Sequence, residues 1–200
     1  MIELNKSDMI GKGWHRECFI HPEDDKLCLK VVVSGNDQET KREQSYYQLL
    51  KKRNVTWDKL PKFHGNIETN FGSGAIFDLI RDENGDVAKT VEFYLNDESL
   101  MQEMHQHIHT ALIDLKDYLI DQNIITMSIK PKNLLYQKQC GLQGSIYIVD
   151  NIGNSDLFPI SSYSRYFGHK KLDRKWKKFQ SLLIKSYPQS PLIINIAQTI

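Results

Sequence analysis

Alternating apolar and polar residues in the first third of the chain predict a small antiparallel sheet. Two β-rich runs in "RECFIHPEDDKLCLKVVV", residues 16–33, flank a proline and acidic residues typical of a hairpin turn. Gly11 and Gly13 precede this hairpin, and we place them in a loop that enters the second strand. "LPKFHGNIET" and "GSGAIFDLIRDENGDVAKTVEFYL" predict further strands, with "ENGD" as a tight turn.

One helix interrupts these strands. "NDQETKREQSYYQLLKKR" has acidic residues early and lysines late, which the helix dipole favours, and Asn36 or Asp37 suits the N-cap. Tyr46, Leu49 and Leu50 would form its buried face. The first third of the chain therefore predicts a sheet with one helix packed on it.

The rest of the chain is predominantly helical in pattern. From Asp97 to about Gln122, apolar residues recur every three or four positions and predict a helix with one core face. "LLYQ" and "SIYIVD" predict two short strands, and "SRYFGHKKLDRKWKKFQSLLIKSY" predicts at least one amphipathic helix. The apolar residues of these two helices are Leu100, Met104, Ile108, Ala111, Leu115 and Leu119 in the first, and Leu172, Trp176, Phe179 and Leu183 in the second.

The change from strands to helices near residue 95 predicts two lobes. Residues 1–95 would form a β-rich lobe that binds a nucleotide, and residues 96–200 a short helical lobe. A cleft between two such lobes is a natural ligand site. The apolar tail "LIINIAQTI" leaves three alternatives open, since it could pack on the body, meet another chain or mark only where this chain ends.

Composition and charge exclude several classes of function. A net charge of +1 gives no electrostatic reason to expect nucleic acid as a partner. The 3 cysteines form no CxxC pair, so we expect reduced thiols in a cytoplasmic protein and no zinc site. His105 and His109 are one helical turn apart without a third ligand, which argues against a metal there. No apolar run approaches the roughly 18 residues of a membrane-spanning helix.

Glycines and a strand lysine suggest phosphate binding. Gly11 and Gly13 would let backbone N–H groups approach phosphates, and Lys30 on the following hairpin would neutralise their charge. The alternative interpretation is that Lys30 is an exposed strand lysine and that "GKG" is a simple turn. In the next helix Glu39 and Glu43 share one face, and we expect Glu43 to form a buried ion pair with Lys30.

Two oxygen-bearing residues could hold Mg²⁺. Asn133 follows a proline-containing loop in "IKPKNLL", where its amide either closes a turn or ligates a metal ion. Asp150 ends the apolar run "SIYIV" before "NIGN", so its carboxylate would emerge at a sheet edge. Hard cations prefer such carboxylate and amide oxygens. ATP and Mg²⁺ are therefore the cofactors that the sequence predicts.

The order of these features resembles the protein-kinase-like fold: a glycine loop, a strand lysine, a helix glutamate, a Lys-Pro-x-Asn loop, then Asp before glycine. "IKPKN" is similar to the end of a kinase catalytic loop, and "DNIG" to the kinase metal loop with one extra residue. The resemblance implies an α+β, two-lobe fold with a small antiparallel β lobe and an abbreviated helical lobe.

A narrower resemblance is to the PhoP regulatory network protein family, the YrbL-like proteins. It extends from about Met9 to at least Trp176 and includes "IGKGWHRECFIHPEDDKLCLKV", "KREQSYYQLL", "LPKFHGNIET", "IKPKNLL" and "VDNIGNS". The resemblance implies a kinase-like protein of a Gram-negative bacterium, connected to a magnesium-responsive regulatory network. It implies no particular substrate.

The sequence departs from the kinase pattern where catalysis would occur. Ser128 stands at the position of the catalytic aspartate, after Thr126 and Met127. A serine hydroxyl cannot serve as the general base, which typically contributes about 10²–10⁴-fold to the rate. Arg16 replaces the third glycine of the loop, as in small-molecule phosphotransferases. Only a short segment follows Asp150, so the platform for a protein substrate is missing. These departures predict weak or absent phosphotransfer.

Three functions stay open at this point. The first is a kinase-like nucleotide-binding protein that regulates through a protein partner; the second is an atypical kinase of a small molecule or a lipopolysaccharide core sugar; the third is a scaffold without nucleotide. The basic stretch "HKKLDRKWKK" is either a solvated helix face or, through residues 170–178, a contact with an anionic glycolipid or the inner membrane surface.

Overall fold

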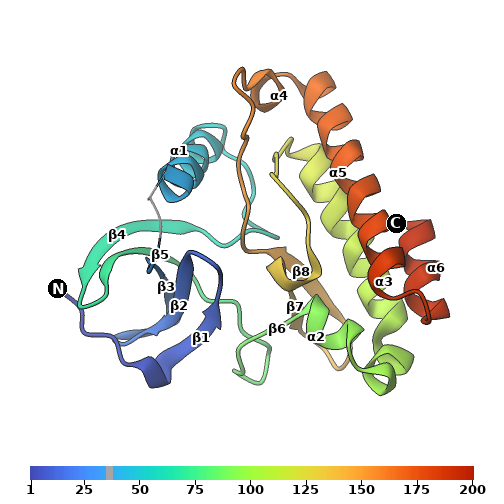
Figure 1. Cartoon of the computed structure of the whole chain (residues 1–200), viewed down its shortest axis with the longest axis horizontal. Helices are drawn as coiled ribbons and strands as arrows, with labels where there is room; N and C mark the ends of the chain where they lie inside the picture. The colour runs from blue at the N-terminus through green and yellow to red at the C-terminus, as the bar shows by residue number, and fades with distance from the viewer. Residues whose placement is uncertain (35–37) are drawn as a thin grey trace.

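Five antiparallel strands form the N-terminal sheet of this α+β structure, a computed structural model that describes residues 1–34 and 38–200. The strands lie in the order β1-β2-β3-β5-β4 (Figure 1). The predicted hairpin is confirmed, because β2 pairs with β3. The bounds are β1 Met9–Lys12, β2 Arg16–His21, β3 Asp24–Val32, β4 Phe63–Thr69 and β5 Gly72–Asp78. A short 3₁₀ turn, η1 Lys6–Asp8, precedes them.

The placement of the glycines needs one correction. Gly11 lies within β1, opposite Cys18 of β2, whereas Gly13 lies in the turn that follows. β1 is short and largely exposed, so it carries no alternation of apolar and polar residues from which it could be predicted.

Helix α1, Gln38–Lys52, is held against the sheet by aromatic rings. Its Tyr47 is buried, and its ring packs edge-on against Phe77 of β5 at 5.3 Å and parallel to Trp57 at 6.0 Å, measured between centroids. Tyr46 and Leu50 are buried as predicted. The expected N-cap, Asn36 or Asp37, lies outside the described residues.

The C-terminal part contains a second, three-stranded sheet covered by helices. Helix α3 packs beside β8, and α5 runs along α3 (Figure 1). The bounds are β6 Lys89–Thr90, α2 Val91–Leu95, α3 Glu98–Asp121, η2 Pro131–Asn133, β7 Leu134–Lys138, β8 Gly144–Ile148, α4 Ile160–Tyr163, α5 Arg165–Ser186 and α6 Pro191–Thr199.

The predicted long helix is confirmed as α3, and its capping explains its start. The Asp97 side chain accepts a hydrogen bond from the Leu100 N–H at 2.9 Å. "VEFYL", by contrast, is wrong as a strand, because it forms α2. Thr90 caps this single turn by accepting from the Phe93 N–H, and Val91, Tyr94 and Leu95 are buried at helical spacing.

Residues 89–95 make their contacts with the C-terminal elements. β6 pairs with β7, and α2 packs on α3. These residues lie on the N-terminal side of the boundary placed at residue 95. One large apolar core also runs through the whole molecule, from Tyr47 and Phe77 to Trp176. No helix among residues 1–34 and 38–200 is long and apolar enough to cross a membrane.

The apolar tail forms α6 and packs on the body, against α3 and α5. Ile193, Ile196 and Ile200 are buried, and Gln180 of α5 donates a hydrogen bond to the Ile200 carbonyl at 2.6 Å. Of the alternatives for this tail, the structure shows the first.

The packing of α6 predicts a stability effect. We expect Ile196→Ala to lower the free energy of unfolding by about 2–5 kcal/mol, because it removes buried methyl groups and leaves a cavity. Gln198→Ala, two residues further on and on the exposed face, should change it by less than about 0.5 kcal/mol. Urea unfolding measures both. Equal effects of the two substitutions would contradict the packing of α6 on α3 and α5.

Candidate functional site

Arg16 joins three segments that are far apart in the sequence. It lies at the start of β2, and its two terminal nitrogens bind Glu43 Oε2 of α1 and Asp150 Oδ1, just after β8. The Glu43 side chain is only 3% exposed and that of Asp150 is 37% exposed. Burial alone would lower the pKa of Arg16, but Glu43 and Asp150 raise it above its ordinary value. Arg16 is therefore a fixed cation between two carboxylates.

Lys30 lies beside this arginine and has another partner than the sequence predicted. Its Nζ donates to the Val149 carbonyl and lies 4.3 Å from the centroid of the Phe77 ring. Among the described residues Lys30 and Glu43 form no ion pair, so that expectation is wrong. Arginine takes the carboxylate because its planar guanidinium can bind two carboxylates at once, whereas an ammonium is a single point charge.

One buried oxygen of this cluster is left without a partner. Glu43 Oε1 is inaccessible to solvent and accepts no hydrogen bond among the described residues. The hydroxyl of Tyr47, one turn further along α1, is likewise buried and forms no hydrogen bond among these residues. An unsatisfied buried polar atom typically costs about 1–3 kcal/mol. Glu43 can thus accept one further donor.

The predicted phosphate-binding glycines flank this cluster in the sheet. Gly11 is opposite Cys18, which is in turn opposite Lys30 on the next strand. The Gly13 N–H donates to the Arg16 carbonyl at 2.7 Å, which closes the turn directly before the Arg16 side chain. The glycines and Arg16 therefore belong to β1, β2 and the turn between them, and Lys30 to the adjoining central strand β3.

Cys18 places a thiol on β2, between Gly11 and Lys30. All three cysteines are free, as expected. A hydrogen bond with Cys28 lowers the pKa of Cys18, and the charges of Lys30 and Arg16 act in the same direction. The pKa of Cys28 is raised by the same hydrogen bond and by burial.

Asn133 and Asp150 lie on adjoining segments. The Asn133 carbonyl accepts a hydrogen bond from the Val149 N–H at 3.0 Å, one residue before Asp150. Asn133 is buried, and its side-chain amide forms no hydrogen bond within residues 1–34 and 38–200. The structure therefore brings together Lys30, Glu43, Asn133 and Asp150, although their roles stay predictions.

Ser128 lies close to the same loop. Thr126 Oγ1 donates to the Ser128 carbonyl at 3.0 Å and to the Asn151 carbonyl at 2.9 Å, and Met127 N–H also donates to the Asn151 carbonyl. The Ser128 hydroxyl forms no hydrogen bond in the part of the chain that the structure describes. The loop after Asp150 can turn here because Asn151 adopts a left-handed φ of 61° and Gly153 a φ of 140°.

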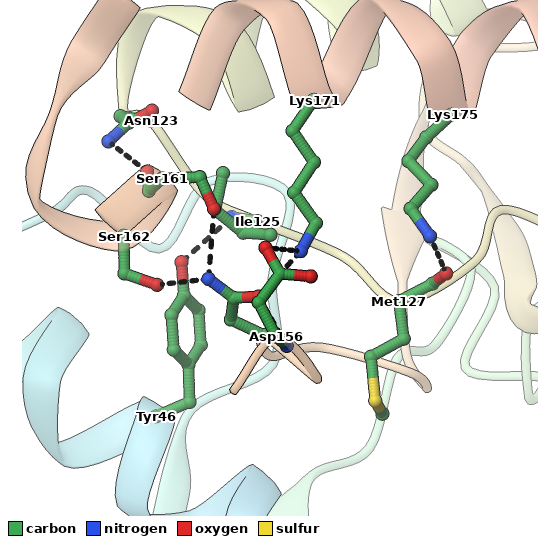
Figure 2. Close-up of polar contacts among 10 residues, drawn as sticks. Tyr46, Asn123, Ile125, Met127, Asp156, Ser161, Ser162, Lys171 and Lys175 are labelled. Atoms are coloured by element: carbon green, nitrogen blue, oxygen red, sulfur yellow. Dashed lines mark hydrogen bonds and ion pairs between the residues drawn. The ribbon is translucent and has the colours of Figure 1, made fainter. Parts of the chain in front are cut away.

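Two lysines of α5 hold these loops from the opposite side (Figure 2). Lys171 is buried; its Nζ donates to Asn154 Oδ1 at 2.5 Å and pairs with Asp156 Oδ2 at 2.7 Å. The Lys175 ammonium donates to the Met127 carbonyl. Burial, and then the charges of Lys171 and Lys178, lower the pKa of Lys175.

The sequence analysis missed this internal role of the basic helix. Lys171 and Lys175 each directly precede a buried residue, Leu172 and Trp176, and so lie at the border of the apolar stripe. A lysine at such a border extends its aliphatic stem along the core and its ammonium to a nearby polar group. This position in the pattern is the signal that could have identified both.

The donor set fits a hard cation only in part. Asp150 and Asn133 offer a carboxylate and an amide oxygen, which Mg²⁺ accepts, and Mg²⁺ normally keeps water or phosphate oxygens as its other ligands. Within the described residues no group of three or more His, Cys, Asp or Glu is placed to hold a metal ion. Because Arg16 binds Asp150 Oδ1, a cation at that oxygen would compete with the guanidinium.

The Arg16 bridge predicts a measurable coupling. We expect Arg16→Met to destabilise the protein by about 3 kcal/mol, because it leaves the buried Glu43 carboxylate unpaired. Glu43→Met should then cost less in the Arg16→Met background than alone, with a coupling of about 1–3 kcal/mol in a urea-unfolding cycle.

The matched control is Lys12→Met. The Lys12 side chain is 67% exposed, and its partner Glu17 keeps Lys6, so this substitution should have little effect. A coupling near zero between Arg16 and Glu43 would contradict the bridge.

Comparison with known proteins assigns the chain to a family. The sequence profile of the family described as "PhoP regulatory network protein YrbL" matches residues 2–183. Two curated proteins described as "Uncharacterized protein YrbL", from Escherichia coli (strain K12) and Shigella flexneri, are each 36% identical over 182 residues, which covers 90% of this chain and 86% of theirs. The chain therefore belongs to the YrbL family of PhoP regulatory network proteins.

Proposed function

We propose that this chain is a kinase-like nucleotide-binding protein of a bacterial regulatory network, acting in the cytoplasm with little or no phosphotransfer. The regulatory part rests on the family name. The nucleotide part rests on Arg16, which joins Glu43 and Asp150, two residues that were predicted from separate motifs. Lys30 on a strand, Glu43 on the next helix, and Asn133 and Asp150 beyond occupy the order of a kinase nucleotide site.

The contacts of the candidate site would allow its charged residues to exchange partners when a nucleotide binds. Lys30 donates to the Val149 carbonyl, and Glu43 Oε1 is buried without a hydrogen-bond donor among the described residues. The phosphates of a nucleoside triphosphate would attract Arg16 and Lys30, because charge-assisted hydrogen bonds to phosphate are strong. If Arg16 turned toward phosphate, Lys30 could pair with Glu43, and that carboxylate would keep a cation. The free oxygen of Glu43 is what favours this exchange.

Released from Arg16, Asp150 would hold Mg²⁺ together with Asn133. The cation would supply charge neutralisation for the phosphates. Ser128, in contrast, offers only a hydroxyl where a kinase has its base. The candidate site is therefore suited to binding a nucleotide and poorly suited to deprotonating the hydroxyl that would accept the phosphoryl group.

Nucleotide binding predicts thermal stabilisation. At an ATP concentration of about 100 times Kd, with Mg²⁺ present, binding to the folded state adds about 2.7 kcal/mol. We expect the melting temperature to rise by several degrees. Lys30→Ala and Asp150→Asn should abolish the rise, whereas Lys62→Ala, at an exposed lysine directly before β4, should keep it. No rise at millimolar ATP would favour the scaffold without nucleotide.

Arg16 gives a more specific version of this experiment. Since Arg16 competes with a cation for Asp150, Arg16→Met should make the ATP-induced stabilisation more dependent on Mg²⁺. The comparison is the melting shift with ATP alone against that with ATP and Mg²⁺, in both proteins. An unchanged Mg²⁺ dependence would contradict the competition.

The atypical kinase is the second candidate, and the unengaged Ser128 hydroxyl and Asn133 amide favour it. Ser128→Asp should raise ADP release above that of the unaltered protein, by up to about 10²–10⁴-fold, because it restores a general base. Ser128→Ala is the matched control and should leave the rate unchanged. A Ser128→Asp protein that still binds ATP but releases no ADP would exclude the kinase and leave the binding module.

A further inference from the structure

The segment after the Asp150 loop exposes a series of large apolar side chains. Leu157 is 89% exposed and Phe158 is 74% exposed, so both project almost wholly into solvent. The series continues along the chain into α4 and the first turn of α5, with Ile160, Tyr163, Tyr166 and Phe167, each more than half exposed. We call residues 157–167 the apolar tip. It lies where the chain reaches α4, at the top of Figure 1.

The apolar tip is anchored from behind. The buried Lys171 pairs with Asp156, immediately before Leu157. On the other side, Asn154 Nδ2 donates to the hydroxyls of Ser161 and Ser162 at 2.9 Å, directly after Ile160. Ser161 and Ser162 are buried, so polar residues face the core while their apolar neighbours face solvent. The internal contacts thus fix the outward direction of Leu157 and Phe158.

The close packing of α5 strengthens this anchor. Gly168 leaves room for the Asn123 amide, whose Nδ2 donates to the Ser161 carbonyl at 3.2 Å. A Cβ at position 168 would lie 1.7 Å from Asn123 Oδ1, so no larger residue fits there. The chain around Ser161 is therefore held at a defined distance from α5.

A basic face continues from the tip along α5. Tyr166, Lys170, Arg174 and Lys177 follow one another at spacings of four, four and three, which places them on one side of the helix. All are exposed, Lys178 is exposed beside them, and Asp173 is the acidic residue of this face. The opposite side carries the buried Leu172, Trp176 and Phe179. The outer face of α5 is thus strongly cationic.

We propose that the apolar tip and the basic face of α5 together bind an anionic lipid bilayer. A bilayer of this kind offers both environments side by side, with negative headgroups for the lysines and arginine and an apolar interior for Leu157 and Phe158. Protruding side chains on a convex segment suit a fluid surface, which closes around them. The positive charge of the basic face favours an anionic bilayer, because a neutral bilayer would not attract it.

The surface lies outside the nucleotide cleft. Lys171 and Lys175 point inward to the loops of the candidate site, whereas Lys170, Arg174 and Lys177 point outward. Binding to a bilayer can therefore be tested independently of ATP binding.

Vesicle co-sedimentation tests the proposal on the full chain. We expect binding to vesicles of phosphatidylcholine with one third phosphatidylglycerol, weaker binding as salt rises, and little binding to phosphatidylcholine alone. Lys170→Gln combined with Arg174→Gln should weaken binding on the order of twentyfold, at about fivefold per cation. Leu157→Ser combined with Phe158→Ser should weaken it at least about tenfold, with no change in net charge.

Two control variants match these changes on the N-terminal sheet. Trp14→Ser removes an 88% exposed aromatic ring, and Lys26→Gln with Lys62→Gln removes two exposed charges. Both controls should bind vesicles like the unaltered protein. Equal losses in the controls and the tip variants would overturn the proposal, and so would binding that does not depend on anionic lipid.

Sedimentation velocity separates the bilayer from a second copy of the chain. The proposal expects the same sedimentation coefficient for the unaltered protein and the Leu157→Ser, Phe158→Ser variant in the absence of lipid. A dimer that dissociates in this variant would show that the tip is covered by another copy, and would overturn assignment to a bilayer.

Discussion

The arrangement of the candidate site depends on one buried cation held between two carboxylates. Arg16 comes from the sheet, Glu43 from α1 and Asp150 from the segment after β8. Removing charges from water is costly unless each finds its partner, so the burial of Arg16 and Glu43 depends on their pairing. A single guanidinium thereby fixes the position of the helix relative to the sheet, and of both relative to the C-terminal loops.

Helix α5 holds the loops of the candidate site from the side opposite to Arg16. Lys175 binds the backbone beside Ser128, and Lys171 binds Asn154 and Asp156. Loop segments 126–128 and 150–156 thus lie between a cation of the sheet and two cations of a helix. Lys171 and Lys175 point toward these loops, whereas Lys170, Arg174 and Lys177 lie on the solvent-exposed side of α5. The basic residues of this one helix therefore divide between internal contacts and the surface.

Periodicity in the sequence was sufficient for the β2–β3 hairpin, α3 and α5, because each buries a continuous stripe or an alternating face. It failed for α2, whose single turn is too short to show a period and depends on the Thr90 cap. The order of motifs singled out Lys30, Glu43, Asn133 and Asp150, which lie on segments that the structure links through Arg16 and the backbone of Val149. The partner of Glu43 could not be predicted, because it depends on which of two nearby cations reaches the carboxylate in three dimensions.

The connection between the two sheets is hydrogen-bonded to both of them. Residues 82 and 83 are clamped to β7, since Lys138 N–H donates to Asp82 Oδ1 and Glu83 N–H donates to the Lys138 carbonyl. Leu79, a few residues earlier, is instead bonded to the N-terminal sheet through the Lys26 carbonyl. Between them, Arg81 is bonded to both sheets, because its Nε donates to the Asp25 carbonyl of β3 and its own carbonyl accepts from Gln137 of β7. The covalent link between the sheets is therefore also a hydrogen-bonded one, and it holds β3 and β7 at a fixed separation on the side away from α1.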